Sequence, residues 1–252
     1  MTQDVSSGMQ RVEHIMGMPI VADIRDDIGD HELDRVFDWL RFVDDTFSTY
    51  RDDSEVSRLN RGELVLEDAH PDVKEVLQRC EKLRLETNGY FDARARQSGE
   101  LDPSGLVKGW SVDRAAALLD EMGIRNYALS AGGDMVLRGG ALPDAVWRVG
   151  IQHPLSNMQI ADVVEGSDLA VATSGEYARG THVLDPHTGR PPTGVLSVTI
   201  TGPDLGTADA YATAAFAMGE KGPHWTARLR GYEAMTILAD ERVLKTPGFP
   251  SS

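Results

Sequence analysis

Apolar residues repeat with two different periods along this chain, and the two periods occupy separate blocks. Alternation over 12–24 predicts a strand, and helical spacing over 33–47, 73–83 and 112–122 predicts three helices. Further strands are expected near 126–130, 134–138, 146–151, 168–173, 195–201, 234–239 and 242–246, with a fourth helix at about 208–219. Because regular strand–helix–strand alternation is missing, the pattern predicts an α+β fold with mixed or antiparallel sheets, flanking helices and two lobes.

Composition narrows the class of protein. The 252 residues contain no stretch with linker composition, so we expect a single domain over 12–249 after a flexible segment at 1–11. The formal charge of -15 argues against a nucleic-acid-coating surface and against adhesion to anionic membranes. No apolar segment approaches the length of a membrane span, and we expect a soluble, cytoplasmic protein. Cys80 is the single cysteine, which excludes an internal disulfide and favours a buried thiol.

A run from residue 101 to 114 places Asp102, two glycines and Lys108 directly before an apolar helical repeat. The start of a helix offers free backbone N–H groups and a partial positive charge, and Lys108 adds a cation. Gly105 and Gly109 would let the backbone approach a ligand closely. The run therefore indicates a binding site for a phosphate-bearing ligand. An ordinary loop followed by a helix could have the same sequence pattern.

Two oxygen-bearing side chains, Asp209 and Thr213, lie four residues apart at the start of the predicted fourth helix. This spacing projects both from one face, and hard oxygen ligands suit Mg²⁺, which completes its coordination with water and phosphate. An acid in a first helical turn also complements the helix dipole, and a threonine can bond to its own backbone. Both interpretations stay open on this evidence.

Four further motifs could belong to a site. His182, at the edge of a predicted strand, could act as a general base, or could only hydrogen-bond across a turn. Gly132 and Gly133 predict a hairpin turn, or a place where the backbone meets a ligand. The aromatic residues of 88–92 could line a ring pocket or be buried. Tyr50 is either a turn anchor or an aromatic residue of a lid, and the segment 53–60 after it offers a capping box for a short helix.

Taken together and in order, these motifs resemble the ApbE-type FAD:protein FMN transferase family. The matching segments are 16–17, 47–50, 54–60, 89–92, 102–113, 132–134, 147–151, 172–175, 182–191, 208–213 and 246–249. The stretch from Asp92 to Asp102 is shorter than is usual in that family, and no export signal is evident. The chain therefore resembles a short-loop, non-exported member.

The resemblance implies an α+β fold related to the T-fold, with FAD and Mg²⁺ as cofactors. Such proteins attach FMN from FAD to a threonine or serine hydroxyl of an acceptor protein and release AMP, and some hydrolyse FAD. It also implies the site residues. Catalysis would involve His182 and Asp209, the metal ligands would be Gly105, Asp209 and Thr213, and the flavin nucleotide would contact Met16, Tyr50, Tyr90, Phe91, Asp92, Asp102, Lys108 and Val183.

Two functions follow as alternatives. The first is Mg²⁺-dependent FMN transfer to an acceptor flavoprotein, with FAD hydrolysis as a side reaction. The second is a non-catalytic protein that carries or sequesters FAD and has lost acceptor docking. We expect neither a nucleic-acid partner nor membrane insertion.

Overall fold

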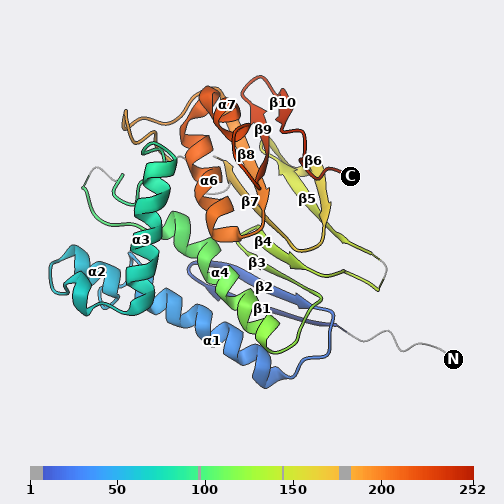
Figure 1. The fold of residues 1–252 in the computed structure, drawn as a ribbon, viewed down its shortest axis with the longest axis horizontal. Coiled ribbons are helices and arrows are strands. Elements are labelled where there is room, and N and C mark those ends of the chain that lie inside the picture. Colours follow the sequence, from blue (N-terminus) through green and yellow to red (C-terminus); the bar gives the residue numbers. More distant parts are fainter. Residues whose placement is uncertain (1–7, 96–97, 144, 176–182) are drawn as a thin grey trace.

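A computed structural model describes residues 8–95, 98–143, 145–175 and 183–252 (Figure 1). Its helices are α1 Asp30–Phe47, α2 Glu55–Asn60, α3 Pro71–Glu86, α4 Ser104–Glu121, α6 Leu205–Ala217 and α7 Gly222–Thr226, with 3-10 turns η1 Leu66–Asp68 and η2 Gly219–Lys221. Its strands are β1 Met9–Ile15, β2 Met18–Ile24, β3 Tyr127–Ala131, β4 Asp134–Arg138, β5 Trp147–His153, β6 Ser156–Gly166, β7 Leu169–Gly175, β8 Val195–Gly202, β9 Glu233–Leu238 and β10 Val243–Lys245.

Eight of these strands form one sheet in the order β1-β2-β3-β4-β7-β8-β9-β10. Every neighbouring pair among them is antiparallel. Strands β5 and β6 form a separate two-stranded antiparallel sheet, and β6 also bridges to Ser251 near the C-terminus. The predicted α+β class is confirmed, and the large sheet is antiparallel.

The two faces of the large sheet are covered differently. Helices gather on one side of it, where α6 packs against β7 and β8 while α4 packs against β3, α1 and α6 (Figure 1). Their interior is a continuous apolar core that includes Phe37, Leu119 and Phe216. On the other face, Trp147 and Ile151 of β5 pack with apolar residues of β3, β4, β7 and β9. The central strands of the sheet are therefore covered on both faces, and the helical side carries the candidate site.

The prediction of a single strand over 12–24 is wrong in one respect, because this segment forms a hairpin of β1 and β2. Met16 and Gly17 form its two-residue turn, with φ values of 55° and 70°. Such a turn needs left-handed backbone at both positions, which glycine adopts readily and other residues rarely. The alternation in the sequence continued through the turn because both arms have the same period of two.

The segment around Gly105 also differs from the expectation. Helix α4 begins at Ser104, so Gly105, Lys108 and Gly109 lie inside the helix and not in a loop before it. Helix α6 begins at Leu205, earlier than predicted, because the Asp204 side chain accepts the Thr207 N–H and caps it. Strand β6 was not predicted. The other predicted strands and helices are present, including the short α2 capped by Ser54.

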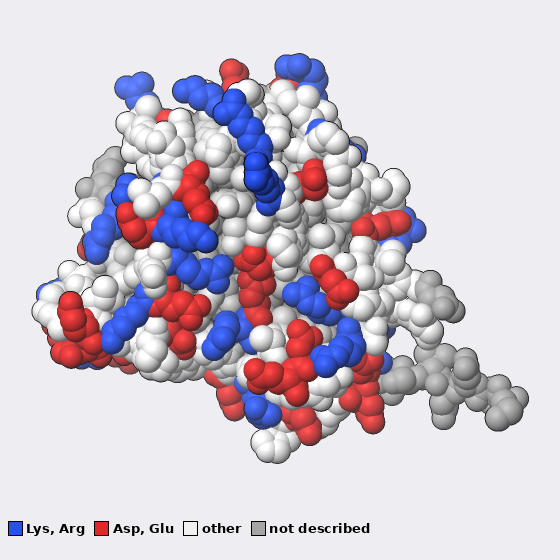
Figure 2. Space-filling view, viewed as in Figure 1, with Lys and Arg blue, Asp and Glu red and all other residues white. Residues whose placement is uncertain are grey.

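The outer surface carries both signs of charge. In Figure 2, Lys and Arg side chains are interspersed with Asp and Glu side chains over the visible face. Within the described ranges, none of the helices has the length and apolarity needed to traverse a lipid bilayer.

Candidate functional site

Helices α4 and α6 cross with their backbones almost in contact, and this crossing forms the candidate site. A Cβ atom built on Gly109 would lie 2.5 Å from the Leu205 carbonyl oxygen and 2.8 Å from the Gly206 Cα. One built on Gly206 would lie 3.2 Å from the Trp110 Cα. Larger residues at either position would push the helices apart. The glycine at 109 thus serves a close approach of two helices, whereas the sequence suggested a close approach to a ligand.

Two carboxylates fix the start of α6 at this crossing. Asp113 of α4 accepts the backbone N–H groups of Leu205 and Gly206, each at 2.8 Å. Asp204 accepts the Thr207 N–H at 2.8 Å. These N–H groups are among those that a helix cannot satisfy internally, so both acids stabilise the first turn of α6. The register between α4 and α6 is therefore set by side chains as well as by packing.

The crossing brings Lys108 of α4 to two carboxylates from other elements. Its ammonium contacts the Asp134 carboxylate at the start of β4 and lies 3.3 Å from Asp209 Oδ1 on α6. Asp134 and Asp209 are 3 % and 4 % exposed. Burial alone would lower the pKa of Lys108, but Asp209 and Asp134 outweigh it and raise that pKa. Burial raises the pKa of Asp209, against the opposing effect of Lys108.

The two oxygens of Asp209 have different surroundings. Asp209 Oδ2 is buried and has no hydrogen-bond partner among the described residues. Thr213 lies one turn further along α6, where its hydroxyl is 3.3 Å from the Ser174 hydroxyl. A buried carboxylate oxygen without a donor is costly unless a ligand completes it.

The donors around that oxygen suit a divalent cation. Among the described residues, no group of three or more His, Cys, Asp or Glu side chains could hold a metal by itself. Asp209 and Thr213 nevertheless supply hard oxygen donors from one helical face, and Mg²⁺ characteristically takes few protein ligands and keeps water or phosphate oxygens. The chemistry of these residues therefore fits Mg²⁺ and would not fit a metal that needs a closed cage of side chains.

The first turn of α4 is held in place from both sides. Asp102 accepts the Ser104 N–H at 3.1 Å, and a Cβ on Gly105 would lie 3.1 Å from the Phe91 ring. Phe91 is 3 % exposed, so its ring belongs to the core beneath this turn. Gly105 precedes Lys108 by three residues and shares its face of the helix. Phe91, which the sequence predicted as a nucleotide contact, therefore supports the first turn of α4 from the core.

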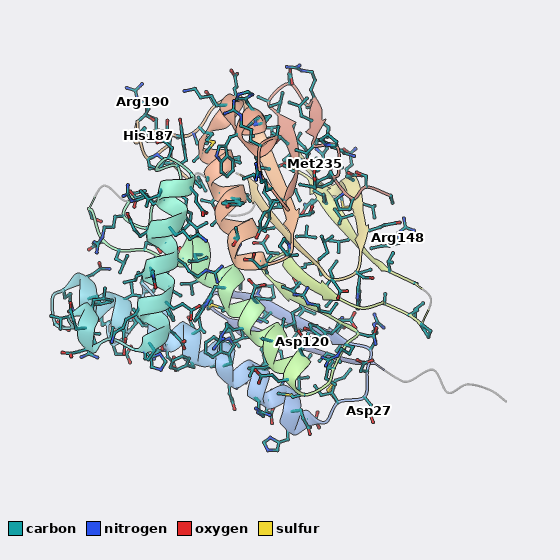
Figure 3. All side chains as sticks on the ribbon, in the orientation of Figure 1. Asp27, Asp120, Arg148, His187, Arg190 and Met235 are labelled. Carbon is teal, nitrogen blue, oxygen red and sulfur yellow. The ribbon has the colours of Figure 1, made fainter. Side chains whose placement is uncertain are left out.

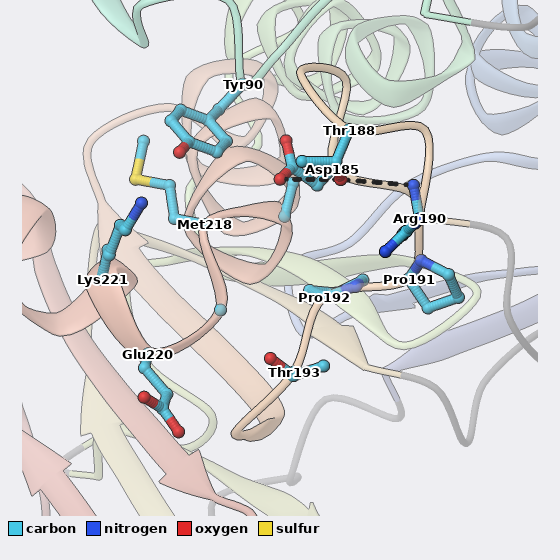
Figure 4. A pocket seen from close by; sticks show the side chains of 12 residues that line it. Tyr90, Asp185, Thr188, Arg190, Pro191, Pro192, Thr193, Met218, Glu220 and Lys221 are labelled. Atoms are coloured by element: carbon cyan, nitrogen blue, oxygen red, sulfur yellow. Dashed lines mark hydrogen bonds between the residues drawn. The ribbon is translucent and has the colours of Figure 1, made fainter.

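A cavity of ≈ 610 Å³ opens beyond the end of α6 (Figure 4). Its lining includes Tyr90, Ala217 and Met218, together with the loop from Asp185 to Thr193 and the residues Glu220 and Lys221. Because Ala217 follows Thr213 by four residues and Asp209 by eight, the cavity begins about one helical turn beyond Thr213 and two beyond Asp209. A volume of this size accommodates a small-molecule ligand.

Tyr90, which lines this cavity, packs against His187. Their rings meet edge to face with centroids 4.6 Å apart, and the His187 ring bonds the Asn88 carbonyl at 3.0 Å. In Figure 3, His187 and Arg190 lie on the loop near the ends of α3 and α6. This loop is therefore attached to the turn that carries Tyr90.

The remaining predicted site residues lie on several separate segments of the chain. Met16 packs partly buried at the β1–β2 turn, Val183 is 9 % exposed in the core, and the Asp92 carboxylate accepts the Arg94 N–H at 2.8 Å. Tyr50 is 91 % exposed, between α1 and α2. His182 lies outside the described residues, and its predicted role stays a prediction.

Two site residues were missed by sequence reasoning. The sequence indicates Asp134 only as the last residue of the segment 132–134, and Asp113 only as the last residue of the segment 102–113, with no role for either. A carboxylate placed at the first position of a buried strand is the signal that could have singled out Asp134, since unpaired buried acids are rare. Cys80, by contrast, is buried as expected, and burial raises the pKa of its thiol to about 12.

Comparisons with known proteins agree with the resemblance seen in the sequence. The profile of the ApbE family matches residues 16–98 and 93–236. A FAD:protein FMN transferase of Vibrio cholerae serotype O1 (strain ATCC 39541 / Classical Ogawa 395 / O395) is 31% identical over 251 residues, which cover 75% of this chain and 73% of that protein. A FAD:protein FMN transferase of Klebsiella pneumoniae (strain 342) is 31% identical over 156 residues, covering 58% of this chain and 45% of that protein.

The fold has a counterpart among solved structures. The flavin transferase ApbE from Vibrio cholerae superposes with a TM-score of 0.85 at 24% identity, covering 96% of this chain and 98% of that one. The profile match extends over most of the described structure, including α4 and α6, and the 31% identical relative covers 75% of the chain. The chain belongs to the ApbE family.

Proposed function

We propose that this protein transfers FMN from FAD to a threonine or serine hydroxyl of an acceptor protein and releases AMP. The observation that carries the proposal is the buried cluster of Lys108, Asp134 and Asp209, with one Asp209 oxygen unpartnered among the described residues, in a chain of this family. The acceptor oxygen forms a bond to the FMN phosphorus, and the bond from that phosphorus to the oxygen leaving with AMP breaks. The hydroxyl proton passes to a base, for which His182 is the predicted residue.

The site supplies what a pyrophosphate reaction needs. Such reactions depend on positioning and on neutralising charge, since the attacked phosphorus is surrounded by anionic oxygens. Lys108 is held at the α4–α6 crossing by Asp134 and Asp209, and because this cluster has a formal charge of −1, net positive charge would come from a bound metal. We propose that Asp209, Thr213 and the Gly105 carbonyl hold Mg²⁺, which when bound would neutralise charge on the phosphate oxygens.

The flavin nucleotide is proposed to extend from this cluster toward the cavity lined by Tyr90 and Met218. The cavity offers an aromatic ring and a thioether at the end of α6, which suits a planar ring system. Met16, Tyr50, Phe91, Asp92, Asp102 and Val183 stay proposed nucleotide contacts. The T-fold relationship, the two lobes, the single domain over 12–249 and the cytoplasmic location likewise stay predictions.

AMP release tests the proposal. Purified protein is incubated with FAD and Mg²⁺, alone and with synthetic peptides that each contain one threonine or serine, and AMP and flavinylated peptide are followed by chromatography and mass spectrometry. We expect AMP in both cases and a peptide carrying FMN in the second. A protein that retains a flavin spectrum but releases no AMP under any condition would instead be the non-catalytic FAD-binding alternative.

A matched pair of variants connects the activity to the site. Thr213→Val removes the hydroxyl at nearly constant volume, whereas Thr213→Ser keeps it. We expect the valine variant to need more Mg²⁺ for the same rate of AMP release and the serine variant to behave much like wild type. Equal Mg²⁺ requirements in the two variants would remove Thr213 from the proposed metal site.

A further inference from the structure

We propose that Asp134 is a positioning residue that keeps the Lys108 ammonium paired, so that an oxygen of Asp209 stays available to a divalent cation. The inference rests on the proposed function, because it concerns the proposed Mg²⁺ site. It assigns a role to a residue that is neither a proposed metal ligand nor a proposed nucleotide contact.

The geometry shows how firmly Asp134 is placed. One of its oxygens contacts the Lys108 ammonium, and the other accepts the Thr173 N–H of the neighbouring strand β7 at 2.9 Å. Its carboxylate follows the β3–β4 turn, where Gly132 and Gly133 have φ values of 58° and 101°. Both oxygens are therefore engaged, and the backbone on each side is fixed by the hairpin.

Asp209 has the opposite arrangement. Its Oδ1 lies 3.3 Å from the same ammonium, a longer separation than that of the Asp134 contact, and its buried Oδ2 has no partner among the described residues. Lys108 is thus shared unequally. Asp134 has the closer contact, and Asp209 keeps one oxygen for another cation.

The charge of the cluster makes this sharing important. Lys108 with Asp134 and Asp209 has a formal charge of −1, since one cation faces two anions. If residue 134 were neutral, the cluster would be neutral and the ammonium would pair with Asp209 alone. A buried neutral cluster attracts a dication far less than one that carries a negative charge. Asp134 therefore favours metal binding without contacting the metal.

The experiment removes the negative charge of Asp134 and then restores the net charge of the cluster by a second substitution, at Lys108. Mg²⁺ is titrated calorimetrically into wild type, Asp134→Asn, Lys108→Met and the double variant, first without and then with FAD. Asp134→Asn should weaken Mg²⁺ binding by about 10- to 100-fold, which is usual when a group supporting a metal ligand is lost. The double variant again has one unpaired buried carboxylate, so its Mg²⁺ affinity should return to within a few-fold of wild type.

The recovery of Mg²⁺ affinity expected in the double variant distinguishes an effect of charge from an effect of altered structure. A merely structural role for Asp134 would make the double variant worse than Asp134→Asn, which would overturn the inference, as would an unchanged affinity in Asp134→Asn. Circular dichroism checks that each variant is folded, and Asp240→Asn, an exposed acid remote in sequence, should bind Mg²⁺ like wild type. If wild type binds no Mg²⁺ with or without FAD, the proposed metal site itself is overturned. If wild type binds Mg²⁺ and the Asp134 variants do not behave as expected, only the inference about Asp134 is overturned.

Discussion

Three charged side chains from α4, β4 and α6 meet inside the protein, and most of the proposed chemistry depends on them. Asp209 and Lys108 could be named from the sequence because each belongs to a short local motif at the start of a helix. Asp134 could not be linked to them, because its contact with Lys108 joins residues 26 positions apart on different elements. Local patterns indicate residue types, whereas ion pairs across a core depend on the tertiary fold.

Asp209→Ala should abolish measurable AMP release from FAD. The substitution removes the proposed metal ligand but leaves Lys108 paired with Asp134, so the protein should stay folded. Charge neutralisation by a metal contributes several kcal/mol to a phosphoryl transfer, which corresponds to a loss of at least ~100-fold in rate. AMP release by the variant at saturating FAD and Mg²⁺, with circular dichroism as the folding check, measures this. A rate within a few-fold of wild type would remove Asp209 from the proposed mechanism.

At the scale of elements, the site is the product of one helix crossing. The sequence predicted a helix after the glycines at 105 and 109, but not that it includes them, because glycine is a poor helix former and usually marks a loop. Packing overrides that preference here. Only a residue without a side chain lets α4 approach the backbone of α6 at Leu205 and Gly206.

Gly109→Ala should therefore destabilise the protein and weaken Mg²⁺ binding together. The added methyl would lie 2.5 Å from the Leu205 carbonyl oxygen, and separation of α4 from α6 would move Lys108 away from Asp209. Overpacking of this kind costs about 1–3 kcal/mol of unfolding free energy. Urea unfolding and Mg²⁺ calorimetry measure the two effects. Ser104→Ala, an exposed change in the same helix, is the control, and a Gly109→Ala variant as stable as the control would show that the crossing tolerates a methyl.

Asp113, at the α4–α6 crossing, makes the free energy of unfolding depend on pH. Burial raises the pKa of its carboxyl to about 6, against the hydrogen bonds from Leu205 and Gly206, which lower it. The folded state then binds the proton more tightly than the unfolded state does. The contribution of Asp113 to the free energy of unfolding is therefore greatest below pH 4, falls between about pH 4 and 6, and is constant above that range.

Asp113→Asn should remove this dependence. Between pH 4 and 7 the unfolding free energy of the variant should rise relative to wild type by about 2–3 kcal/mol, since one pKa unit corresponds to about 1.4 kcal/mol. Urea titrations of both proteins at the two pH values give the difference. A change in the opposite direction would mean that the two N–H donors, and not burial, determine the pKa of Asp113.

At the scale of the whole molecule, an acidic protein must bind an anionic dinucleotide. The antiparallel sheet and its helical cover follow from apolar periodicity, which is why the α+β class could be predicted from the sequence. Strand β6 was missed because much of its surface is exposed, as at Met158 and Ile160, and no regular alternation marks it. The cavity near Tyr90 was only partly anticipated, since its lining comes from three separate segments.

FAD and Mg²⁺ together should stabilise the folded protein as a whole. A ligand present at about 100 times its dissociation constant adds about 2.7 kcal/mol, which for a chain of this size raises the unfolding temperature by roughly 5–10 °C. Thermal unfolding with FAD alone, Mg²⁺ alone and both measures the increment. We expect the largest shift with both ligands and a much smaller one in Asp209→Ala. Equal shifts in the two proteins would show that the ligands bind independently of Asp209.

A crystal of the protein grown with FAD and Mn²⁺, in which the manganese is located by its anomalous scattering, tests the central claim most directly. The account predicts one manganese peak within coordination distance of Asp209 and Thr213, in contact with the FAD pyrophosphate. A pyrophosphate bound elsewhere, or a manganese peak that does not touch Asp209, would contradict it.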